Sequence, residues 1–199
     1  MPTREQQRTA TRARILDTAT QLLVERGYAG LSTLAVQEAA GLSRGALLHH
    51  FPTIHALTAA LVEHLVQLNE VAARAAAESI GDSADAVDRT LTALLDTMTR
   101  PPARAEQELW AAARTDPDLA TVLRDSERRA GRDLYRVIDT LFGQEITAHP
   151  RYPAIRDLTI AILRGIVVAH PLRTSTQTEI HTIRHWADTI RTLLPLGTH

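Results

Sequence analysis

The chain has 199 residues, of which 44% are hydrophobic and 23% charged, and its formal net charge is −1. This composition argues against an intrinsically disordered chain and is ordinary for a globular protein with a hydrophobic core. The sequence contains no cysteine, which excludes disulfides, thiolate catalysis and cysteine-ligated zinc. The N-terminus has no apolar leader segment, and the most apolar stretch, residues 158–169, is short and contains Arg164. We therefore expect a cytoplasmic protein without a membrane span.

The charge is distributed unevenly along the chain. Residues 1–60 contain six arginines against four acidic residues, whereas the remainder contains sixteen arginines against nineteen acidic residues. The arginines at positions 4, 8, 12 and 14 precede or open the first predicted helix. A small basic head joined to a mildly acidic body is typical of a DNA-reading domain attached to a second domain.

Apolar residues recur with the helical period along the chain, and no strand-like alternation of useful length is present. We therefore predict an all-α protein of about nine helices. The predicted helices cover residues 5–26, 33–40, 44–50, 54–78, 84–99, 103–115, 117–142, 154–170 and 176–194. Between them, the sequence predicts a break at residues 81–83, a loop over residues 143–153 and a turn over residues 171–175.

Residues 31–51 read as two short helices separated at Gly41. Ser32 can cap the first helix by accepting a hydrogen bond from its backbone amides, and Ser43 can cap the second. Gly41 can adopt the left-handed conformation that ends the first helix. Small or apolar side chains that would pack the pair at a steep angle are Leu34 or Ala35, Val36, Ala39, Leu42 and Leu47. The segment therefore predicts a helix-turn-helix, the motif that presents a helix to the major groove of DNA.

The second helix of this pair leaves an outer surface formed by Arg44, Ala46, Leu48, His49 and His50. Arg44 at the helix start can reach a phosphate or a guanine edge, and the two histidines can donate to phosphates or to base acceptors. Because so short a helix reaches few base pairs, specific binding would need two such heads about 34–36 Å apart. We therefore expect a homodimer on an inverted-repeat operator.

The last two predicted helices carry more apolar surface than one packing partner covers. Residues 154–170 are apolar nearly all round, and residues 176–194 have one strongly apolar stripe. Two interpretations are open: both helices are covered within the chain, or they pack against their copies in a second chain as a four-helix interface. For the second interpretation, the predicted interface residues are Ile160, Leu163, Arg164, Val167, Ile183, Trp186 and Ile190.

The stretch from Arg14 to about Leu65 carries several anchors at fixed spacing, among them Glu-Arg-Gly-Tyr at residues 25–28 and Ala-Gly-Leu-Ser-Arg-Gly-Ala-Leu-Leu-His-His-Phe-Pro-Thr at residues 40–53. It resembles the DNA-binding domain of the TetR family of bacterial transcriptional regulators. The DNA-binding residues that this resemblance implies are Ser32, Thr33, Ser43, Arg44, Gly45, Ala46, Leu48, His49 and His50. By the same resemblance Phe51 is structural. Leu48 and Ile54 stand where the family often has tyrosine and lysine, and Gln37 stands where it usually has a small residue.

The resemblance also implies two domains with separate tasks. Residues 1–53 would form the helix-turn-helix DNA-binding domain, and residues 54–199 a helical domain for ligand binding and dimerisation. The chain would then be a transcriptional regulator and not an enzyme, namely a repressor that a small-molecule effector releases from double-stranded DNA, with no cofactor implied. Candidate residues for an effector pocket are Leu65, Leu95, Met98, Leu109, Trp110, Ala113, Tyr135, Ile138 and Ile162, with Arg114 or His170 as polar anchors.

Two alternatives stay open at this point. His181 and His185 lie four residues apart and could hold one metal ion from a single helical turn, as in a metal-dependent helical protein. The sequence offers no third ligand, so we assign no metal site. A helical interaction protein with a weakened DNA-binding head is favoured by Leu48 and Ile54. Hydrolase chemistry is not expected, because the chain has neither a strand-turn setting for a nucleophilic serine nor a glycine-rich phosphate loop.

Overall fold

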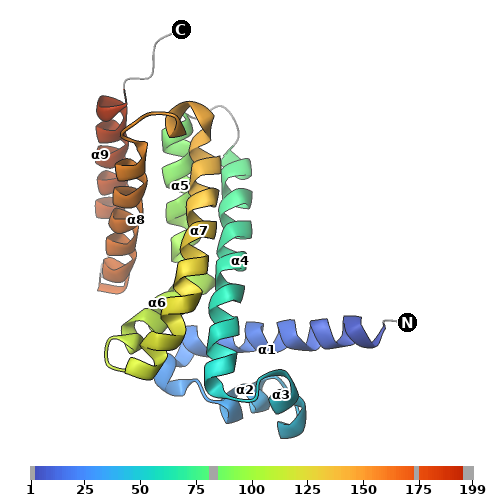
Figure 1. Ribbon diagram of the computed structural model, residues 1–199. Helices are drawn as coiled ribbons and strands as arrows, with labels where there is room; N and C mark the ends of the chain where they lie inside the picture. Colours follow the sequence, from blue (N-terminus) through green and yellow to red (C-terminus); the bar gives the residue numbers. More distant parts are fainter. Residues whose placement is uncertain (1–2, 81–84, 173–174, 195–199) are drawn as a thin grey trace. The chain divides into compact units, whose positions relative to one another are not determined.

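The computed structural model describes residues 3–80, 85–172 and 175–194, and in these ranges the chain consists of helices without a strand (Figure 1). The α-helices are α1 (Arg4–Arg26), α2 (Thr33–Ala39), α3 (Arg44–His50), α4 (Ile54–Ile80), α5 (Ala86–Thr99), α6 (Pro101–Ala113), α7 (Pro117–Thr147), α8 (Tyr152–Ala169) and α9 (Gln177–Leu193). Short 3-10 helices, η1 (Tyr28–Gly30) and η2 (His170–Leu172), follow α1 and α8. The predicted all-α class is confirmed. None of the described helices combines the length with the apolarity that crossing a lipid bilayer requires.

Local hydrogen bonds fix several helix ends, although α5 begins at Ala86, two residues after its predicted start at residue 84. At the start of α1, the Gln6 amide donates to the Thr3 hydroxyl at 3.2 Å, and the Thr3 amide donates to the Gln6 side chain at 2.7 Å. The same helix ends at Gly27, which has a φ of 65°. At the start of α5, Asp85 accepts from the Val87 amide at 2.7 Å. Such caps involve residues two to four apart, which is why short sequence windows locate them.

Two helices begin two residues earlier than predicted, and each has a proline in its first turn. α6 starts at Pro101 and not at residue 103, and α8 starts at Tyr152, followed by Pro153, and not at residue 154. Proline fits the first turn of a helix, because the amide that it lacks has no intrahelical partner there. The predicted helices were therefore too short at these ends.

The predicted loop over residues 143–153 is wrong in its first part. The chain bends at Gly143, where φ is 81°, and helical structure then continues through Thr147. Glycine adopts this positive φ without steric cost, so one residue is enough to redirect the helix. The predicted break at residues 81–83 lies outside the described residues, as does part of the predicted turn over residues 171–175.

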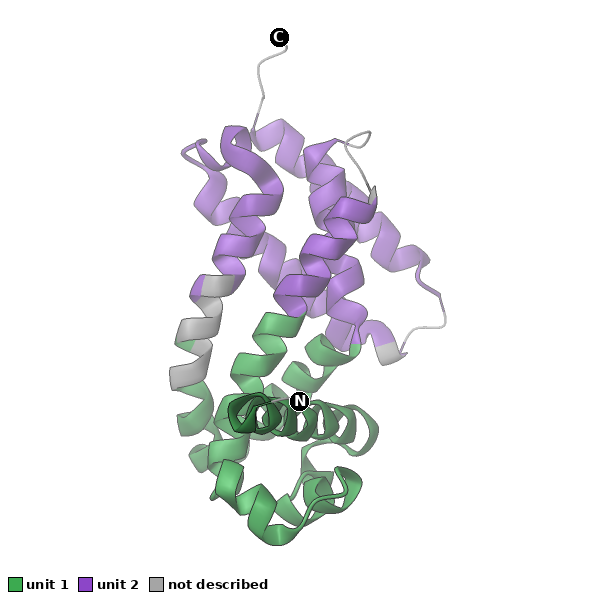
Figure 2. Ribbon diagram, turned by 90° about the vertical axis from the view of Figure 1, so that its right-hand side faces the viewer, with its two compact units in different colours: residues 1–68, 101–130 green, residues 69–100, 131–199 purple. Residues whose placement is uncertain are grey.

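The chain forms two compact units that each combine distant parts of the sequence (Figure 2). Unit 1 contains residues 1–68 and 101–130, and unit 2 contains residues 69–100 and 131–199. Unit 1 therefore includes α6 and the first part of α7, which the sequence assigns to the second domain. These are units of packing, whereas the predicted division at residues 53 and 54 concerns function and stays a prediction.

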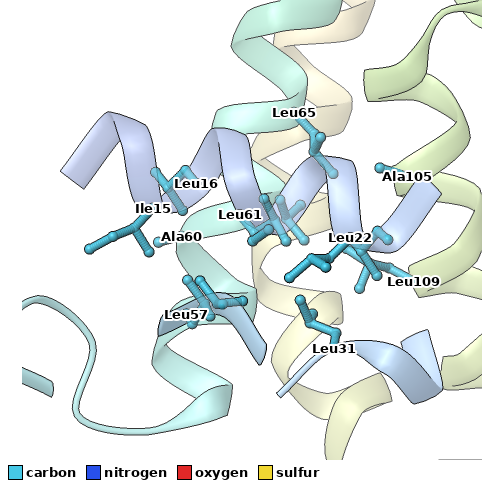
Figure 3. Packing of buried hydrophobic residues seen from close by; sticks show 14 of the residues in the cluster. Ile15, Leu16, Leu22, Leu31, Leu57, Ala60, Leu61, Leu65, Ala105 and Leu109 are labelled. Carbon is cyan, nitrogen blue, oxygen red and sulfur yellow. The ribbon is translucent and has the colours of Figure 1, made fainter. Parts of the chain in front are cut away.

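The core of unit 1 joins α1 to α4, α6 and α7. Figure 3 shows Leu22 of α1 near Leu61 of α4 and Leu109 of α6. The fully buried large side chains of this unit are Ile15, Leu23, Leu47, Phe51, Leu57, Leu61, Leu65, Leu109 and Leu119. Full burial of one such side chain stabilises the fold by about 1.5–3 kcal/mol. The helix-turn-helix therefore rests on a core to which a helix about fifty residues further along the chain contributes.

The core of unit 2 joins α5, α8 and α9, each of which packs against the other two. A buried hydrogen bond connects the last two helices: the Trp186 indole donates to the Thr159 hydroxyl at 2.9 Å. That hydroxyl donates in turn to the Ile155 carbonyl at 2.7 Å, so both polar groups are satisfied inside the core. At the other end of α9, Arg191 forms ion pairs with Asp85 and Asp88 at the start of α5, at 3.3 and 2.6 Å.

Candidate nucleic-acid interface

Helices α2 and α3 form the predicted helix-turn-helix, and the predicted caps hold both of them. The Ser32 hydroxyl accepts from the Ala35 amide at 3.0 Å, and the Ser43 hydroxyl accepts from the Ala46 amide at 3.2 Å. Gly41 lies between the helices with a φ of 63°, the left-handed conformation that the sequence predicts there. These three local features place α3 as a separate short helix directly after the turn.

The inner side of the pair packs on the core of unit 1 through Val36 and Leu47. Of the two alternatives at the start of α2, Ala35 packs against this core whereas Leu34 is exposed. The prediction that Ala39 lies on the inner side is wrong, because the buried alanine is Ala40. The Ala40 amide donates to the Val36 carbonyl at 2.9 Å, so the last turn of α2 brings these two residues onto the same face.

The outer side of α3 stays open to solvent. Arg44, Gly45 and His49 are exposed, and Ala46, Leu48 and His50 are partly exposed. The cap residues Ser32 and Ser43 are exposed as well, and Thr33 is partly exposed. All nine predicted DNA-binding residues therefore keep accessible surface around one short helix, while their contacts with DNA stay a prediction.

A row of side chains runs from α1 to the end of α3. The Arg12 guanidinium lies 4.6 Å from the centroid of the Phe51 ring. The Phe51 and His50 ring centroids are 6.4 Å apart, and those of His50 and His49 are 5.6 Å apart. Partial burial, and then the positive charges of His49, Arg8 and Arg12, lower the pKa of His50 below its ordinary value. These effects disfavour the charged form of His50 in the free protein.

The role of Arg12 in this row was missed by sequence reasoning. The sequence marks Arg8 and Arg12 only as part of an N-terminal run of positive charge. Their spacing of four residues places them one above the other on one face of α1, which was the available signal. Which side chain that face would meet depends on the packing of α1 against α3 and could not be read from the spacing.

The beginning of α4 adjoins the same surface. The Thr53 hydroxyl caps α4 by accepting from the Ala56 amide at 3.0 Å. Ile54, at the position where a lysine is common in the family that the segment resembles, is partly buried against the core of unit 1. Further along α4, His64 lies 2.8 Å from Asp17 of α1. Ile54 thus supplies apolar packing at this position, and a hydrogen-bonded pair links the two helices.

Residues 15–61 match the family model described as bacterial regulatory proteins of the tetR family. The chain belongs to the TetR family. An HTH-type transcriptional regulator of Mycobacterium tuberculosis is 29% identical over 167 residues, which are 83% of this chain and 85% of that protein. The HTH-type transcriptional regulator CymR of Pseudomonas putida is 30% identical over 133 residues, 67% of this chain and 64% of that protein. The chain is therefore a DNA-binding transcriptional regulator, and this is a family of regulators and not of enzymes.

Solved structures of similar proteins support the fold along nearly the whole chain. A transcriptional regulator from Rhodococcus sp. Rha1 has a TM-score of 0.68 at 21% identity and covers 94% of this chain and 99% of that one. The multidrug binding protein EbrR, solved in complex with imidazole, has a TM-score of 0.65 at 20% identity and covers 100% of this chain and 98% of that one. A transcriptional regulator from Saccharomonospora viridis in complex with choline has a TM-score of 0.63 at 20% identity, covering 92% and 96%.

The predicted effector-pocket residues of this TetR-family chain fall into different environments. Those in the core of unit 1 or packed against it are Leu65, Leu109, Trp110 and Ala113. Those in the core of unit 2 or packed against it are Leu95, Met98, Ile138 and Ile162. Of the proposed polar anchors, Arg114 is exposed, and His170 lies 2.9 Å from the buried carboxylate of Glu179. The structure thus gives these residues roles in packing or pairing, and effector binding by them stays a prediction.

Tyr135 is the member of this set that lies in an open groove. The groove runs along α7 and is lined by Arg132, Tyr135, Arg136, Asp139, Thr140, Gly143, Gln144 and Thr147. The Arg156 guanidinium of α8 lies 3.9 Å from the Tyr135 ring centroid, and it also lies 3.3 Å from the Asp139 carboxylate. Because one helix lines the whole groove, it is a shallow surface feature and does not enclose a ligand.

The predicted interface residues of α8 and α9 lie mostly inside unit 2. The buried ones are Ile160, Leu163, Val167, Ile183, Trp186 and Ile190, and Arg164 is partly exposed. They are buried because α5 packs against both helices within the same chain. Six exposed apolar or small residues of α8 and η2 follow one another at intervals of four and three residues, namely Ala154, Leu158, Ala161, Gly165, Val168 and Leu172. Pro153, Asp157 and His170 are exposed as well. The exposed apolar face of α8 is therefore not the face that carries the predicted interface residues Ile160, Leu163 and Val167.

The histidine pair considered for metal binding lies on the exposed side of α9. The His181 and His185 rings are stacked with their centroids 6.4 Å apart, and the Gln177 side-chain amide lies 3.2 Å from the His181 ring. Among the described residues, no group of three histidine, aspartate or glutamate side chains could hold a metal ion. The structure therefore adds no ligand to the two that the sequence offers.

Proposed function

We propose that this TetR-family regulator is a repressor that binds an inverted-repeat operator as a homodimer and leaves it when a small molecule binds. The observation that carries the proposal is the exposed outer side of α3, where Arg44 and His49 are open to solvent while Leu47 anchors the helix to the core. Direct reading of base edges in the major groove requires a helix with one face packed on the protein core and the opposite face exposed. The residues proposed to contact DNA are Ser32, Thr33, Ser43, Arg44, Gly45, Ala46, Leu48, His49 and His50.

The double variant Arg44→Ala, His49→Ala is expected to bind DNA about 5–150-fold more weakly for each base-edge contact that it loses, because a good contact of this kind contributes about 1–3 kcal/mol. The measurement is fluorescence anisotropy on a fragment that flanks the protein's own gene, at one fixed salt concentration. Arg104→Ala is the matched control, since Arg104 is also exposed but lies on α6. Unchanged affinity in the double variant would remove Arg44 and His49 from the DNA contact.

The homodimer is proposed to form through α8. Its exposed residues Ala154, Leu158, Ala161, Gly165 and Val168, followed by Leu172 of η2, come at intervals of four and three residues along the chain. This spacing places the five α8 residues on one face of the helix. Leu158 and Val168 are exposed large hydrophobic side chains, and a Cβ added at Gly165 would meet nothing within 4 Å in its own chain. Small residues in the middle of an apolar stripe allow a second helix to approach closely. The partner proposed for this face is α8 of a second copy.

The response to an effector is proposed to act through α4. This helix begins directly after the recognition helix and contributes residues to both units, up to Leu68 in unit 1 and from Asn69 in unit 2. The proposed division is DNA reading by residues 1–53 and sensing by residues 54–199. The imidazole and choline complexes of structural neighbours support a small-molecule effector, and these two compounds are suitable first probes.

A compound that raises the melting temperature of the protein is expected to weaken its DNA binding about 5–150-fold, which corresponds to a coupling of about 1–3 kcal/mol. Thermal melts would be measured first with imidazole, choline and aliphatic analogues, and DNA affinity would then be measured with each stabilising compound. Compounds that leave the melting temperature unchanged serve as controls for salt effects. A stabilising compound that leaves the DNA affinity unchanged would contradict release by that ligand.

A further inference from the structure

The end of the recognition helix is covered by a charged residue of α1. Phe51 directly follows α3, and its amide donates to the Leu47 carbonyl at 2.8 Å, so it closes the last turn of that helix. Phe51 is only 1% exposed, although it lies at the edge of the helix-turn-helix. Arg12 is an exposed residue of α1, and its guanidinium lies 4.6 Å from the centroid of this ring. The contact thus joins α1 to the point where α3 ends.

The contact continues from Phe51 toward the outer side of α3. The Phe51 ring adjoins His50, and His50 meets His49 edge to face. A guanidinium over an aromatic face is attracted by the negative charge of that face, and it also excludes water from the ring. Displacing Arg12 would therefore expose one side of Phe51 and free the histidine end of α3 to shift.

We propose that Arg12 is a positioning residue for DNA binding, whose contact with Phe51 fixes the end of α3 so that His49 and His50 meet the DNA in one orientation. This inference rests on the proposed DNA-reading role of α3. It assigns Arg12 a role that differs from that of a phosphate ligand. The difference is measurable, because a phosphate ligand acts through charge and salt whereas a positioning residue acts through the geometry of its neighbour.

Arg8 provides a matched control within the same helix. It lies one helical turn before Arg12, and both guanidinium groups act by their charge on His50. In the described part of the chain, the arginine whose guanidinium lies over Phe51 is Arg12. The variants Arg8→Gln and Arg12→Gln therefore remove equal charges near His50, but only the second removes the contact with the ring.

The first part of the experiment uses NMR on the full-length free protein. Both variants are expected to raise the pKa of His50, followed through its imidazole signals, since each removes a nearby positive charge. Only Arg12→Gln is expected to shift the Phe51 ring signals, which are assignable because the chain contains two phenylalanines. Arg12→Lys, which keeps a cation, is expected to restore part of the Phe51 shift. Unchanged Phe51 signals in Arg12→Gln would overturn the contact.

The second part measures DNA affinity against salt concentration. Arg12→Gln is expected to lower the affinity about two- to fivefold at every salt concentration, the range of a cation–π contact at an exposed site. A phosphate ligand would instead reduce the slope of log affinity against log salt by about one. A loss that disappears at high salt, or no loss, would overturn the positioning role. The double variant at Arg44 and His49, measured on the same DNA, shows separately whether α3 reads it.

Discussion

Replacing Leu47 with alanine is expected to lower the free energy of unfolding by about 2–5 kcal/mol. Leu47 is the inward-facing residue of α3 and is only 1% exposed, in the core shared by α1, α4 and α6. Removing its side chain takes away apolar burial and leaves a cavity that surrounding helices fill only in part. Since a domain of this size is stable by about 5–15 kcal/mol, the expected loss is a large part of the total. DNA binding should fall as well, because α3 has no other side chain as deeply buried.

The measurement is urea unfolding followed by circular dichroism at one protein concentration, with the slope against urea used to check that the variants unfold alike. Leu34→Ala is the matched control, because Leu34 lies in the same motif but is 59% exposed. Its substitution is expected to change stability by no more than about 0.5 kcal/mol. Equal losses in the two variants would contradict the assignment of Leu47 as the anchor of the recognition helix.

Replacing Val168 with glutamate is expected to raise the dissociation constant of the homodimer about a hundredfold or more, equivalent to at least about 2.7 kcal/mol. Val168 is 68% exposed within its own chain, so the substitution should leave the fold of unit 2 intact. In a two-fold symmetric interface the two copies of the stripe meet, which would bring two carboxylates into an apolar contact. Operator affinity should fall with dimerisation, because one head alone reaches few base pairs.

Sedimentation velocity over a range of micromolar concentrations measures this effect, and helicity by circular dichroism verifies the fold. Val71→Glu is the matched control: Val71 is 66% exposed and lies on α4, outside the α8 stripe. The control is expected to sediment like the unchanged protein. If the Val168 variant also sediments like the unchanged protein, the α8 stripe is not the dimer interface.

Much of the helix-turn-helix could be predicted from short stretches of sequence. Ser32, Ser43 and Gly41 occupy the predicted caps and turn, because a cap requires only backbone amides two or three residues away. The exposed side of α3 was also predicted, since the helical period and the anchor at Leu47 define the opposite face. Ala39 was placed wrongly, because the residue one helical turn after Val36, and so on its face, is Ala40, whereas Ala39 is exposed.

The packing between helices that are far apart in the chain was harder to predict from the sequence. α6 packs against α1 in unit 1, although the two helices are separated by about seventy-five residues of chain. Neither helix has a sequence pattern that indicates the other as its packing partner. The same limit applied to Arg12: its position on α1 was visible, but the ring beneath it was not. A pattern of apolar residues indicates that a face is covered without indicating which element covers it.

The two apolar faces of α8 illustrate which properties the sequence determined and which only the tertiary structure decided. The sequence by itself determined the helix, its nearly continuous apolar surface and the helix-turn-helix that marks the chain as a DNA-binding regulator. Only the tertiary structure decided that α5 and α9 bury Leu163 while Leu158 and Val168 remain exposed. The physical reason is that capping and periodicity arise between near neighbours in the chain. Burial depends instead on which distant helix packs against a given face in the folded protein.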